Sequence, residues 1–158
     1  MIRLQGVHKS FGDQVVLDGL DITIPAGQIT AVIGPSGEGK SVMLKHMIGL
    51  LQPDSGAVEV EGESITAASR ARLNSIREKF GMLFQNAALF DSMNVFDNVA
   101  FPLREKTRLS KEEIRNRVMS ALEDVGLKNV EHKYTDQLSG GMKKRVALAR
   151  ALLLNPKI

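Results

Sequence analysis

Three glycines, a lysine and two serines lie close together in the stretch Gly-Pro-Ser-Gly-Glu-Gly-Lys-Ser, residues 34–41. Glycine reaches backbone conformations closed to other residues and lets main-chain N–H groups approach a phosphate closely. We expect Lys40 to place its charge on the β- and γ-phosphates of a nucleotide, and the Ser41 hydroxyl to be a ligand for Mg²⁺. The pattern indicates a loop that binds a nucleoside triphosphate; a simple strand-to-helix turn is the alternative. The predicted contacts are Gly34, Pro35, Ser36, Gly37, Glu38, Gly39, Lys40 and Ser41.

The segments on either side of this loop support the phosphate-binding interpretation. Residues 29–33 form a short β-branched run that is typical of a buried strand, and residues 42–51 begin an apolar helix. The start of a helix adds unpaired N–H donors and the positive end of a dipole, both of which favour an anion. We therefore expect a strand, a glycine loop and a helix in that order.

A small sheet is predicted before the loop. Apolar residues suggest three short strands, beginning at Ile2, covering residues 15–17 and covering residues 20–24. Phe11 lies in the turn between the first two, where its ring could stack on a purine base. A hydrophobic plug on the sheet is an equally good interpretation of Phe11 from spacing alone.

A second buried strand is predicted at residues 80–84, and Gln85 follows it directly. In open α/β sheets, ligands collect beyond the carboxyl ends of the strands. Gln85 is therefore a candidate for positioning the Mg²⁺ ion or the attacking water of the nucleotide. The alternative, weighted equally, is a polar loop residue that caps the next element.

Helices and turns dominate the later part of the chain. Helices are predicted at residues 66–79 and 94–104, and a third begins after Ser110 and ends at Gly126. A last helix follows Leu138-Ser139-Gly140-Gly141-Met142, with Ser139 as its cap and the two glycines in its first turn. Such a helix start is open to an anion, although an ordinary capped helix explains it too.

Composition limits the class of protein without naming a ligand. The 158 residues are 43% hydrophobic and 25% charged, with a net charge of +3, which is typical of a globular domain. There is no cysteine, which fits a reducing compartment, and no stretch is long enough to span a membrane. We expect a cytosolic protein that touches a membrane only through a partner.

With residues 34–41, Gln85 and residues 138–142 in this order and spacing, the whole chain resembles an ATP-binding-cassette (ABC) ATPase. The resemblance implies an α/β P-loop NTPase fold with an antiparallel β-subdomain and a helical signature subdomain. It implies that Phe11 stacks on adenine, that Gln85 is the Q-loop glutamine, and that Ser139, Gly140 and Gly141 contact ATP held by the opposite subunit. Met142 departs from the glutamine that is most common in the signature. A P-loop kinase or GTPase would not explain residues 138–142.

A narrower resemblance, carried by residues 84–103 and by the signature Leu-Ser-Gly-Gly-Met-Lys-Lys-Arg, is to the Mla-type ATPases of bacterial phospholipid transporters. It implies ATP and Mg²⁺ as cofactors and a homodimer on the inner face of the cell membrane. The homodimer would dock on a permease near residues 85–101, with a lipid-binding MCE protein in the same complex and no nucleic acid. A soluble ABC ATPase that acts on nucleic acid or ribosomes is the alternative. A nucleotide-binding module without catalysis describes these residues by themselves.

The resemblance also predicts how the chain is divided and what it lacks. Residues 1–85 correspond to the β-subdomain and P-loop core, 86–140 to the helical subdomain, and 141–158 to the signature helix and the start of the next core strand. The Walker B aspartate and catalytic glutamate of the family lie beyond that point. We therefore expect these residues alone to hydrolyse ATP negligibly, and to be oligomeric through exposed strand edges or only partly ordered.

Overall fold

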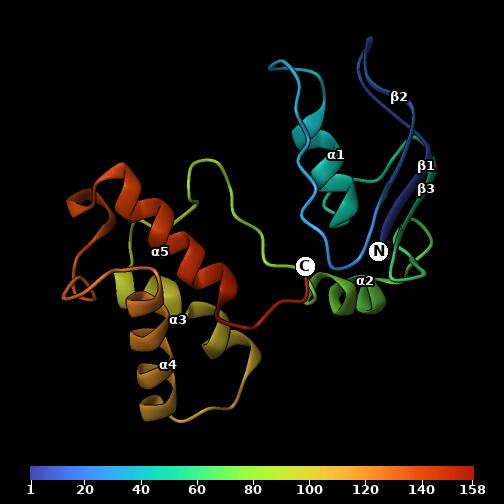
Figure 1. Cartoon of the computed structure of the whole chain (residues 1–158). Coiled ribbons are helices and arrows are strands. Elements are labelled where there is room, and N and C mark those ends of the chain that lie inside the picture. The colour runs from blue at the N-terminus through green and yellow to red at the C-terminus, as the bar shows by residue number, and fades with distance from the viewer. The chain divides into compact units, whose positions relative to one another are not determined.

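A computed structural model describes all residues from 1 to 158, and they form two compact units, Met1–Lys79 and Phe80–Ile158. Figure 1 shows the elements of both units along the chain. Each unit has its own buried side chains. None of the helices is both long and apolar enough to cross a membrane.

The first unit contains a four-stranded antiparallel sheet with the order β2-β1-β3-β4. Its strands are β1 (Ile2–Phe11), β2 (Gln14–Ile24), β3 (Ser55–Val60) and β4 (Glu63–Ser64). Alternating side chains such as Leu4, Val58 and Val60 are buried on one face, as expected for a sheet covered on one side. The predicted antiparallel β-subdomain is thus confirmed.

The sequence prediction of three strands before the loop is wrong in one respect. Residues 15–17 and 20–24 belong to the single strand β2, which pairs with β1 along its length. The break between them is a register shift near Gly19, which has a φ of 66°. A glycine with positive φ allows a bulge, so the strand bends without ending.

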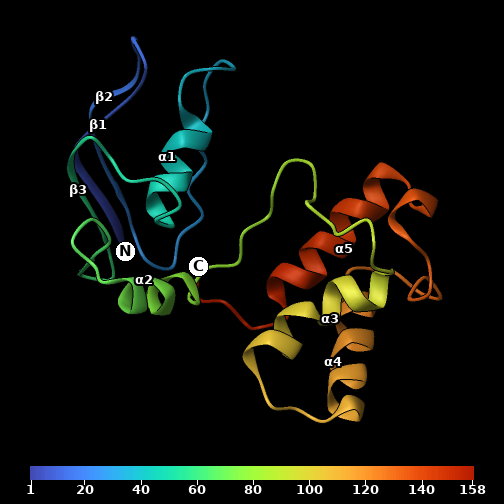
Figure 2. The same ribbon diagram turned by 180° about the vertical axis from the view of Figure 1, so that it is seen from behind.

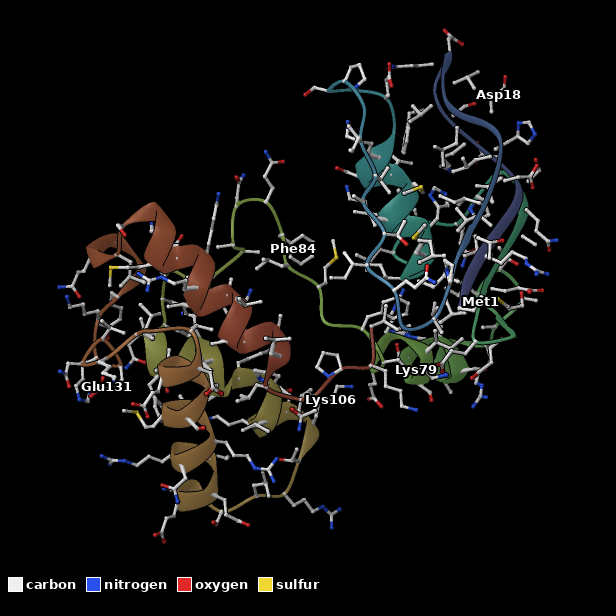
Figure 3. All side chains as sticks on the ribbon, viewed as in Figure 1. Met1, Asp18, Lys79, Phe84, Lys106 and Glu131 are labelled. Atoms are coloured by element: carbon white, nitrogen blue, oxygen red, sulfur yellow. The ribbon has the colours of Figure 1, made fainter.

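Two helices complete the first unit. Helix α1 (Lys40–Met47) buries Met43, His46 and Met47 and packs on the sheet through β2 and β3, as Figure 2 shows from behind. Helix α2 (Arg70–Arg77) is shorter than the predicted segment 66–79 and begins at the cap Ser69. Lys79, labelled in Figure 3, donates to Glu61 and Glu63 at 2.6 and 3.0 Å. These bonds join the end of the unit to the β3–β4 hairpin.

The two predicted core strands are not formed. Residues 29–33 and 80–84 have no regular secondary structure, and the Ile29 and Ile33 side chains are 102% and 92% exposed. A strand is stabilised by ladder hydrogen bonds to a neighbour, and the four paired strands do not include these segments. Apolar β-branched residues alone therefore do not make a strand here.

The second unit is a helical bundle around one apolar core. It contains α3 (Val95–Lys106), α4 (Lys111–Asp124), a 3-10 turn at Thr135–Gln137, and α5 (Gly140–Leu152). The core is formed by side chains such as Val99, Leu103, Val118 and Val146. The three helices pack against one another, so the predicted helical subdomain is confirmed.

The helix ends in this unit follow the local sequence. Ser110 and Glu113 form a reciprocal capping box at the start of α4, and Gly126, with a φ of 69°, ends it. Ser139 caps α5 as predicted, because its hydroxyl accepts a hydrogen bond from the Met142 N–H at 3.3 Å. Residues 155–158 form neither helix nor strand.

Candidate nucleotide-binding site

The predicted phosphate-binding loop is an exposed turn that leads directly into α1. Residues 34–38 are exposed, and α1 begins at Lys40. Gly37 and Gly39 have φ values of 93° and 80°, a region that residues with a side chain rarely adopt. Gly39 is the cap of α1 and supplies no side-chain hydrogen bond, so the first turn of the helix is not closed by a cap. This arrangement leaves main-chain donors for an anion.

Gly39 also fixes the loop to the sheet. A Cβ atom added at this position would lie 2.9 Å from the Val16 carbonyl oxygen and 3.0 Å from the Leu17 Cδ2 atom. Both neighbours belong to β2, so the end of the loop rests directly on that strand. No larger residue fits there without displacing backbone.

Lys40 is held over the loop by the loop's own carbonyl groups. Its Nζ donates to the Gly34 oxygen at 2.7 Å and also to the Pro35 oxygen. The ammonium group is therefore already directed back toward the start of the loop. A triphosphate in the loop would exchange these neutral acceptors for charged ones, which form stronger hydrogen bonds.

Ser41 is the residue of the loop predicted to be a ligand for a magnesium ion. It is exposed in the first turn of α1. No group of three or more acidic or histidine side chains could hold a metal ion by itself. Mg²⁺ usually keeps several waters and takes one or two protein ligands together with substrate phosphates. The single hydroxyl of Ser41 fits an ion that arrives with a nucleotide.

Phe11 is not a buried plug. It is the last residue of β1 and 49% exposed, beside the two-residue turn Gly12-Asp13. The Lys9 Nζ lies 5.5 Å from the centre of the ring and donates to Asp54 at 2.6 Å. This bond to Lys9 is the main reason that the pKa of Asp54 is lowered. The exposed ring is free to stack, and its role with adenine stays a prediction.

Gln85 lies exposed at the start of a turn, residues 85–88, in the second unit. The strand predicted to precede it is absent, so the argument from strand ends does not apply to the observed structure. Ala87 and Ala88 follow in left-handed conformations, with φ values of 62° and 48°. The role of Gln85 stays a prediction that rests on the family resemblance.

The start of α5 presents the second predicted phosphate-binding segment. Ser139, Gly140 and Gly141 are exposed, and a Cβ atom at either glycine would have no neighbour within 4 Å. Open space on this side would let another molecule approach the first turn closely. The Ser139 hydroxyl already accepts one of the first N–H groups.

Two side chains that hold main-chain groups of the second unit escaped the sequence analysis. Arg150 on α5 donates to the Ala87 and Ala88 carbonyls at 3.0 and 2.8 Å, and Asn98 on α3 is fully buried. Arg150 interrupts the most apolar run late in the chain, residues 147–154, and that charge within an apolar run was the available signal. Asn98 gave a similar signal among the apolar residues of α3.

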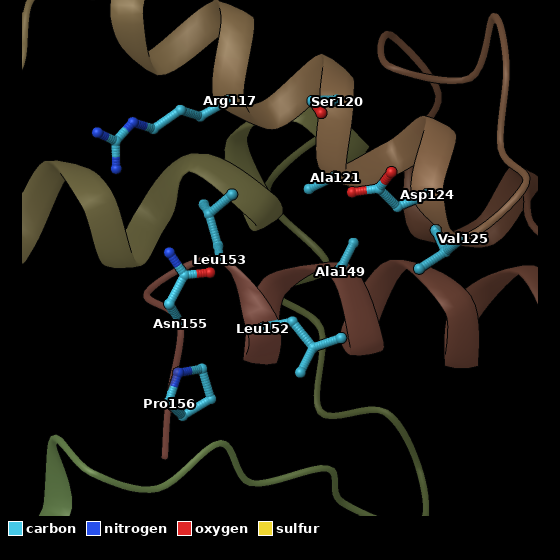
Figure 4. Close-up of a pocket in the computed structure, with 10 residues that line it drawn as sticks. All are labelled: Arg117, Ser120, Ala121, Asp124, Val125, Ala149, Leu152, Leu153, Asn155 and Pro156. Carbon is cyan, nitrogen blue, oxygen red and sulfur yellow. The ribbon is translucent and has the colours of Figure 1, made fainter. Parts of the chain in front are cut away.

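A pocket of about 640 Å³ lies elsewhere in the second unit, between α4 and the end of α5 (Figure 4). It has no predicted site residue in its lining. The lining residues are Arg117, Ser120, Ala121, Asp124, Val125, Ala149, Leu152, Leu153, Asn155 and Pro156.

Comparison with known proteins assigns the class of this chain. The chain belongs to the ABC transporter family, whose sequence pattern matches residues 17–158. It is 50% identical over 157 residues to the probable ribonucleotide transport ATP-binding protein mkl of Mycobacterium tuberculosis. It is 44% identical over 158 residues to MlaF of Escherichia coli K12, the intermembrane phospholipid transport system ATP-binding protein.

The chain spans 44% of the length of mkl and 59% of MlaF, while 99% and 100% of the chain are matched. Among solved structures, it is similar to the dimeric post-hydrolysis state of the ATP-binding cassette MJ0796 bound to ADP and Pi. That match has a TM-score of 0.90 at 34% identity and covers 99% of this chain and 71% of the other. The structure of cbiO1 from Clostridium perfringens gives a TM-score of 0.82 at 33% identity, covering 98% and 62%. The ABC ATPase fold is confirmed.

Proposed function

We propose that the chain is the ATP-binding portion of an ABC transporter ATPase that energises phospholipid transport through a membrane permease. The observation that carries the proposal is the loop at residues 34–41, which joins an uncapped helix start to an inward-directed Lys40 ammonium group. The match to MlaF over every residue of the chain supports the phospholipid part.

The residues of the loop divide the work of holding ATP. The main-chain donors of the loop and of the first turn of α1 bind the phosphate oxygens, and Lys40 neutralises charge on the β- and γ-phosphates. Ser41 would hold an Mg²⁺ ion, which would offset phosphate charge, and Phe11 stacks on the adenine ring. The nucleotide supplies the energy of its phosphoanhydride bond. Gln85 positions the ion or the attacking water.

The second half of the proposal is a homodimer that holds ATP between subunits. Ser139, Gly140 and Gly141 bind the γ-phosphate of ATP in the loop of the other subunit. The dimeric ADP- and Pi-bound structure of the related cassette MJ0796 supports this arrangement. The dimer would attach to the permease near residues 85–101 on the cytoplasmic face of the bacterial membrane, in a complex that includes an MCE lipid-binding protein.

Nucleotide binding is tested with a fluorescent ATP analogue and two lysines of the same helix. Lys40→Ala removes the charge-assisted bonds to phosphate, worth about 1.5–3 kcal/mol, so affinity is expected to fall roughly 10- to 100-fold. Lys45→Ala changes an exposed lysine in the last turn of α1 and is the matched control. Circular dichroism is used to check that both variants are folded. Equal affinities for the Lys40 variant and the natural chain would refute the proposed seating of the phosphates.

The dimer is tested by mixing two singly substituted chains, since the natural chain has no cysteine. Ser36→Cys lies in the loop and Lys144→Cys lies one turn into α5, which leaves residues 139–141 intact. A short bismaleimide is expected to join the two different chains with ATP and not without it. If ATP binds to both chains and no mixed product forms, the sandwich arrangement is wrong.

A ribonucleotide is the alternative transported substrate, because mkl, which is 50% identical to this chain, is described as a probable ribonucleotide transport protein. The two are separated with the full-length protein and its permease in lipid vesicles. Transfer of a fluorescent phospholipid that depends on ATP supports the phospholipid function. Uptake of a radiolabelled ribonucleotide without lipid transfer would replace it.

Negligible ATP hydrolysis by residues 1–158 alone is a separate part of the proposal. We infer that residues 1–158 alone hydrolyse ATP negligibly, because Glu38 supplies the only carboxylate among the residues proposed to hold the nucleotide. Glu38 is the acidic residue of the loop, and its Oε2 atom would lie 3.2 Å from a Cβ atom at Gly34. A phosphate-release assay tests this. Turnover that Lys40→Ala abolishes would contradict it.

A further inference from the structure

The turn that carries Gln85 has an unusual backbone. Ala87 and Ala88, with φ values of 62° and 48°, are consecutive residues in the left-handed region. The Ala87 N–H donates to the Phe84 carbonyl at 3.0 Å, and the Ala88 N–H to the Asn86 carbonyl at 2.7 Å. Residues with a Cβ atom hold such conformations only where the surrounding structure imposes them.

Arg150 is the side chain of α5 that contacts this turn. Its Nη2 atom donates to the carbonyl oxygens of both alanines, at 3.0 Å to Ala87 and 2.8 Å to Ala88. The guanidinium group is half-buried, and this burial lowers the pKa of Arg150. A charged group withdrawn from water needs hydrogen-bond acceptors, and the two carbonyls of the strained turn provide them.

The contacts of Arg150 continue into the next residues of the segment. Its Cζ atom lies 5.8 Å from the centre of the Phe90 ring, and that ring lies 5.0 Å from the ring of Phe101 on α3. The buried Asn98 side chain accepts from the Phe90 N–H at 2.8 Å and donates to the Phe90 carbonyl at 3.0 Å. The segment is thus fixed by α5 at residues 87–88 and by α3 at residue 90.

Part of the turn that Arg150 contacts is buried, and the residues just before that part are exposed. Ala87 is buried, whereas Gln85 and Asn86 remain exposed immediately before it. Figure 1 shows residues 85–94, in yellow-green, beside α5, whose first turn contains Gly140 and Gly141. A movement of α5 would therefore reach the Gln85 turn through the Arg150 side chain.

We propose that Arg150 is a positioning residue that fixes the Gln85 turn to α5, so that the turn moves with the helix that begins at Ser139. The biological use of this coupling rests on the proposed function. In that function, it would link the γ-phosphate contact at residues 139–141 to the permease-facing residues 85–101. The coupling itself is a property of one helical unit and needs no nucleotide.

The test measures a distance between the turn and α5 by pulsed electron paramagnetic resonance. Nitroxide labels are attached at Asn86→Cys and Lys144→Cys, both exposed, in a chain that has no other cysteine. The natural residue at 150 is expected to give one narrow distance distribution. Arg150→Met, which keeps the length and loses the donors, is expected to widen it at least twofold.

Arg145→Met is the matched control on the same helix. Arg145 also donates to main-chain carbonyls, at 3.0 Å to Gly126 and 3.4 Å to Val125, but not to the Gln85 turn. The distribution between residues 86 and 144 is expected to stay narrow in this variant. A second label pair, Glu112→Cys with Lys144→Cys, reports the packing of α4 on α5 and is expected to stay narrow in every variant.

Three results are informative. Widening of the first pair alone in Arg150→Met supports the proposal, and widening of both pairs would show a general loosening of the bundle and overturn it. An unchanged first pair would also overturn it. Arg150→Lys keeps the charge but not the planar fork of donors, so an intermediate width is expected. If Arg150→Met does not fold, the lysine variant decides by the same criteria. Because no nucleotide is added, failure of ATP binding leaves this result unaffected.

Discussion

At the residue scale, Gly39 connects the phosphate-binding loop to the sheet that supports it. Its φ of 80° favours glycine, and its Cα faces the Val16 carbonyl so closely that an added Cβ would lie 2.9 Å away. Gly37, two residues earlier, has a φ of 93° but open space around its Cα. A side chain would strain the backbone at both positions, but it would clash with a neighbouring strand only at Gly39.

We predict that Gly39→Ala destabilises the first unit more than Gly37→Ala does. The left-handed conformation costs about 1–2 kcal/mol for either alanine. Displacement of β2 adds about 1–3 kcal/mol at residue 39 alone. Urea unfolding of the two variants measures the difference. Equal losses of unfolding free energy would show that β2 yields without cost.

The Gln85 turn gives a second prediction at this scale. Ala88 is exposed with a φ of 48°, so Ala88→Gly removes strain and is expected to raise the unfolding free energy by about 1 kcal/mol. Ala121→Gly makes the same chemical change inside α4 and is expected to lower it by about 1 kcal/mol. Thermal unfolding of both variants tests the opposite signs. A loss of stability in Ala88→Gly would mean that the alanine conformation is not strained.

At the element scale, α4 is defined by its first turn. The Ser110 hydroxyl accepts from the Glu113 N–H at 3.2 Å, and the Glu113 carboxylate accepts from the Ser110 N–H at 2.8 Å. Hydrogen bonds from the Ser110 hydroxyl and then from its N–H hold the pKa of Glu113 below its usual 4.5. A lowered carboxyl pKa stabilises the folded chain above the usual pKa, and this stabilisation is lost as the pH falls through the lowered value.

We predict that Ser110→Ala lowers the unfolding free energy by about 1 kcal/mol at neutral pH. The loss is expected to shrink as the pH falls below 4.5, because protonated Glu113 no longer favours the hydroxyl partner. Urea unfolding of Ser110→Ala and of the natural chain, from neutral pH to below 4.5, measures the difference in unfolding free energy. The other carboxylates contribute equally to both chains and cancel in this difference. Ser120→Ala, an exposed serine later in α4, is the control and is expected to have little effect at any pH. A loss independent of pH would argue against the reciprocal cap.

At the scale of the whole molecule, exposed apolar residues are the main feature of the segment before the loop. Ile29 and Ile33 are fully or almost fully exposed, and Val32 lies between them at 40% exposure. Contiguous apolar side chains on a surface favour association with another molecule. The sequence predicts self-association through exposed strand edges, but residues 29–33 form no strand, so exposed apolar side chains replace strand edges as the basis of this prediction.

We predict that the chain self-associates through this segment as its concentration rises. Ile29→Asp combined with Ile33→Asp removes two side chains, each worth about 1.5–3 kcal/mol on burial, so the association constant is expected to fall at least tenfold. Val15→Asp, which changes a single exposed apolar residue on β2, is expected to have no effect. Sedimentation velocity over a concentration series tests this. A monodisperse monomer at all concentrations would refute the association.

The sequence by itself determined the features that depend on neighbouring residues. The spacing of Gly37, Gly39 and Lys40 defined the loop, and Ser110, Gly126 and Ser139 marked helix ends that the structure reproduces. A cap or a turn is made by groups a few residues apart, so its signal is local.

Tertiary structure alone decided the features that need a distant partner. Residues 29–33 have the composition of a strand and yet form none, because ladder bonds require a neighbouring strand and composition does not provide one. Arg150 meets Ala87 and Ala88 across 63 and 62 residues of sequence, and only the packing of the helical unit brings them together. That packing places Arg150 where its guanidinium group can support the Gln85 turn.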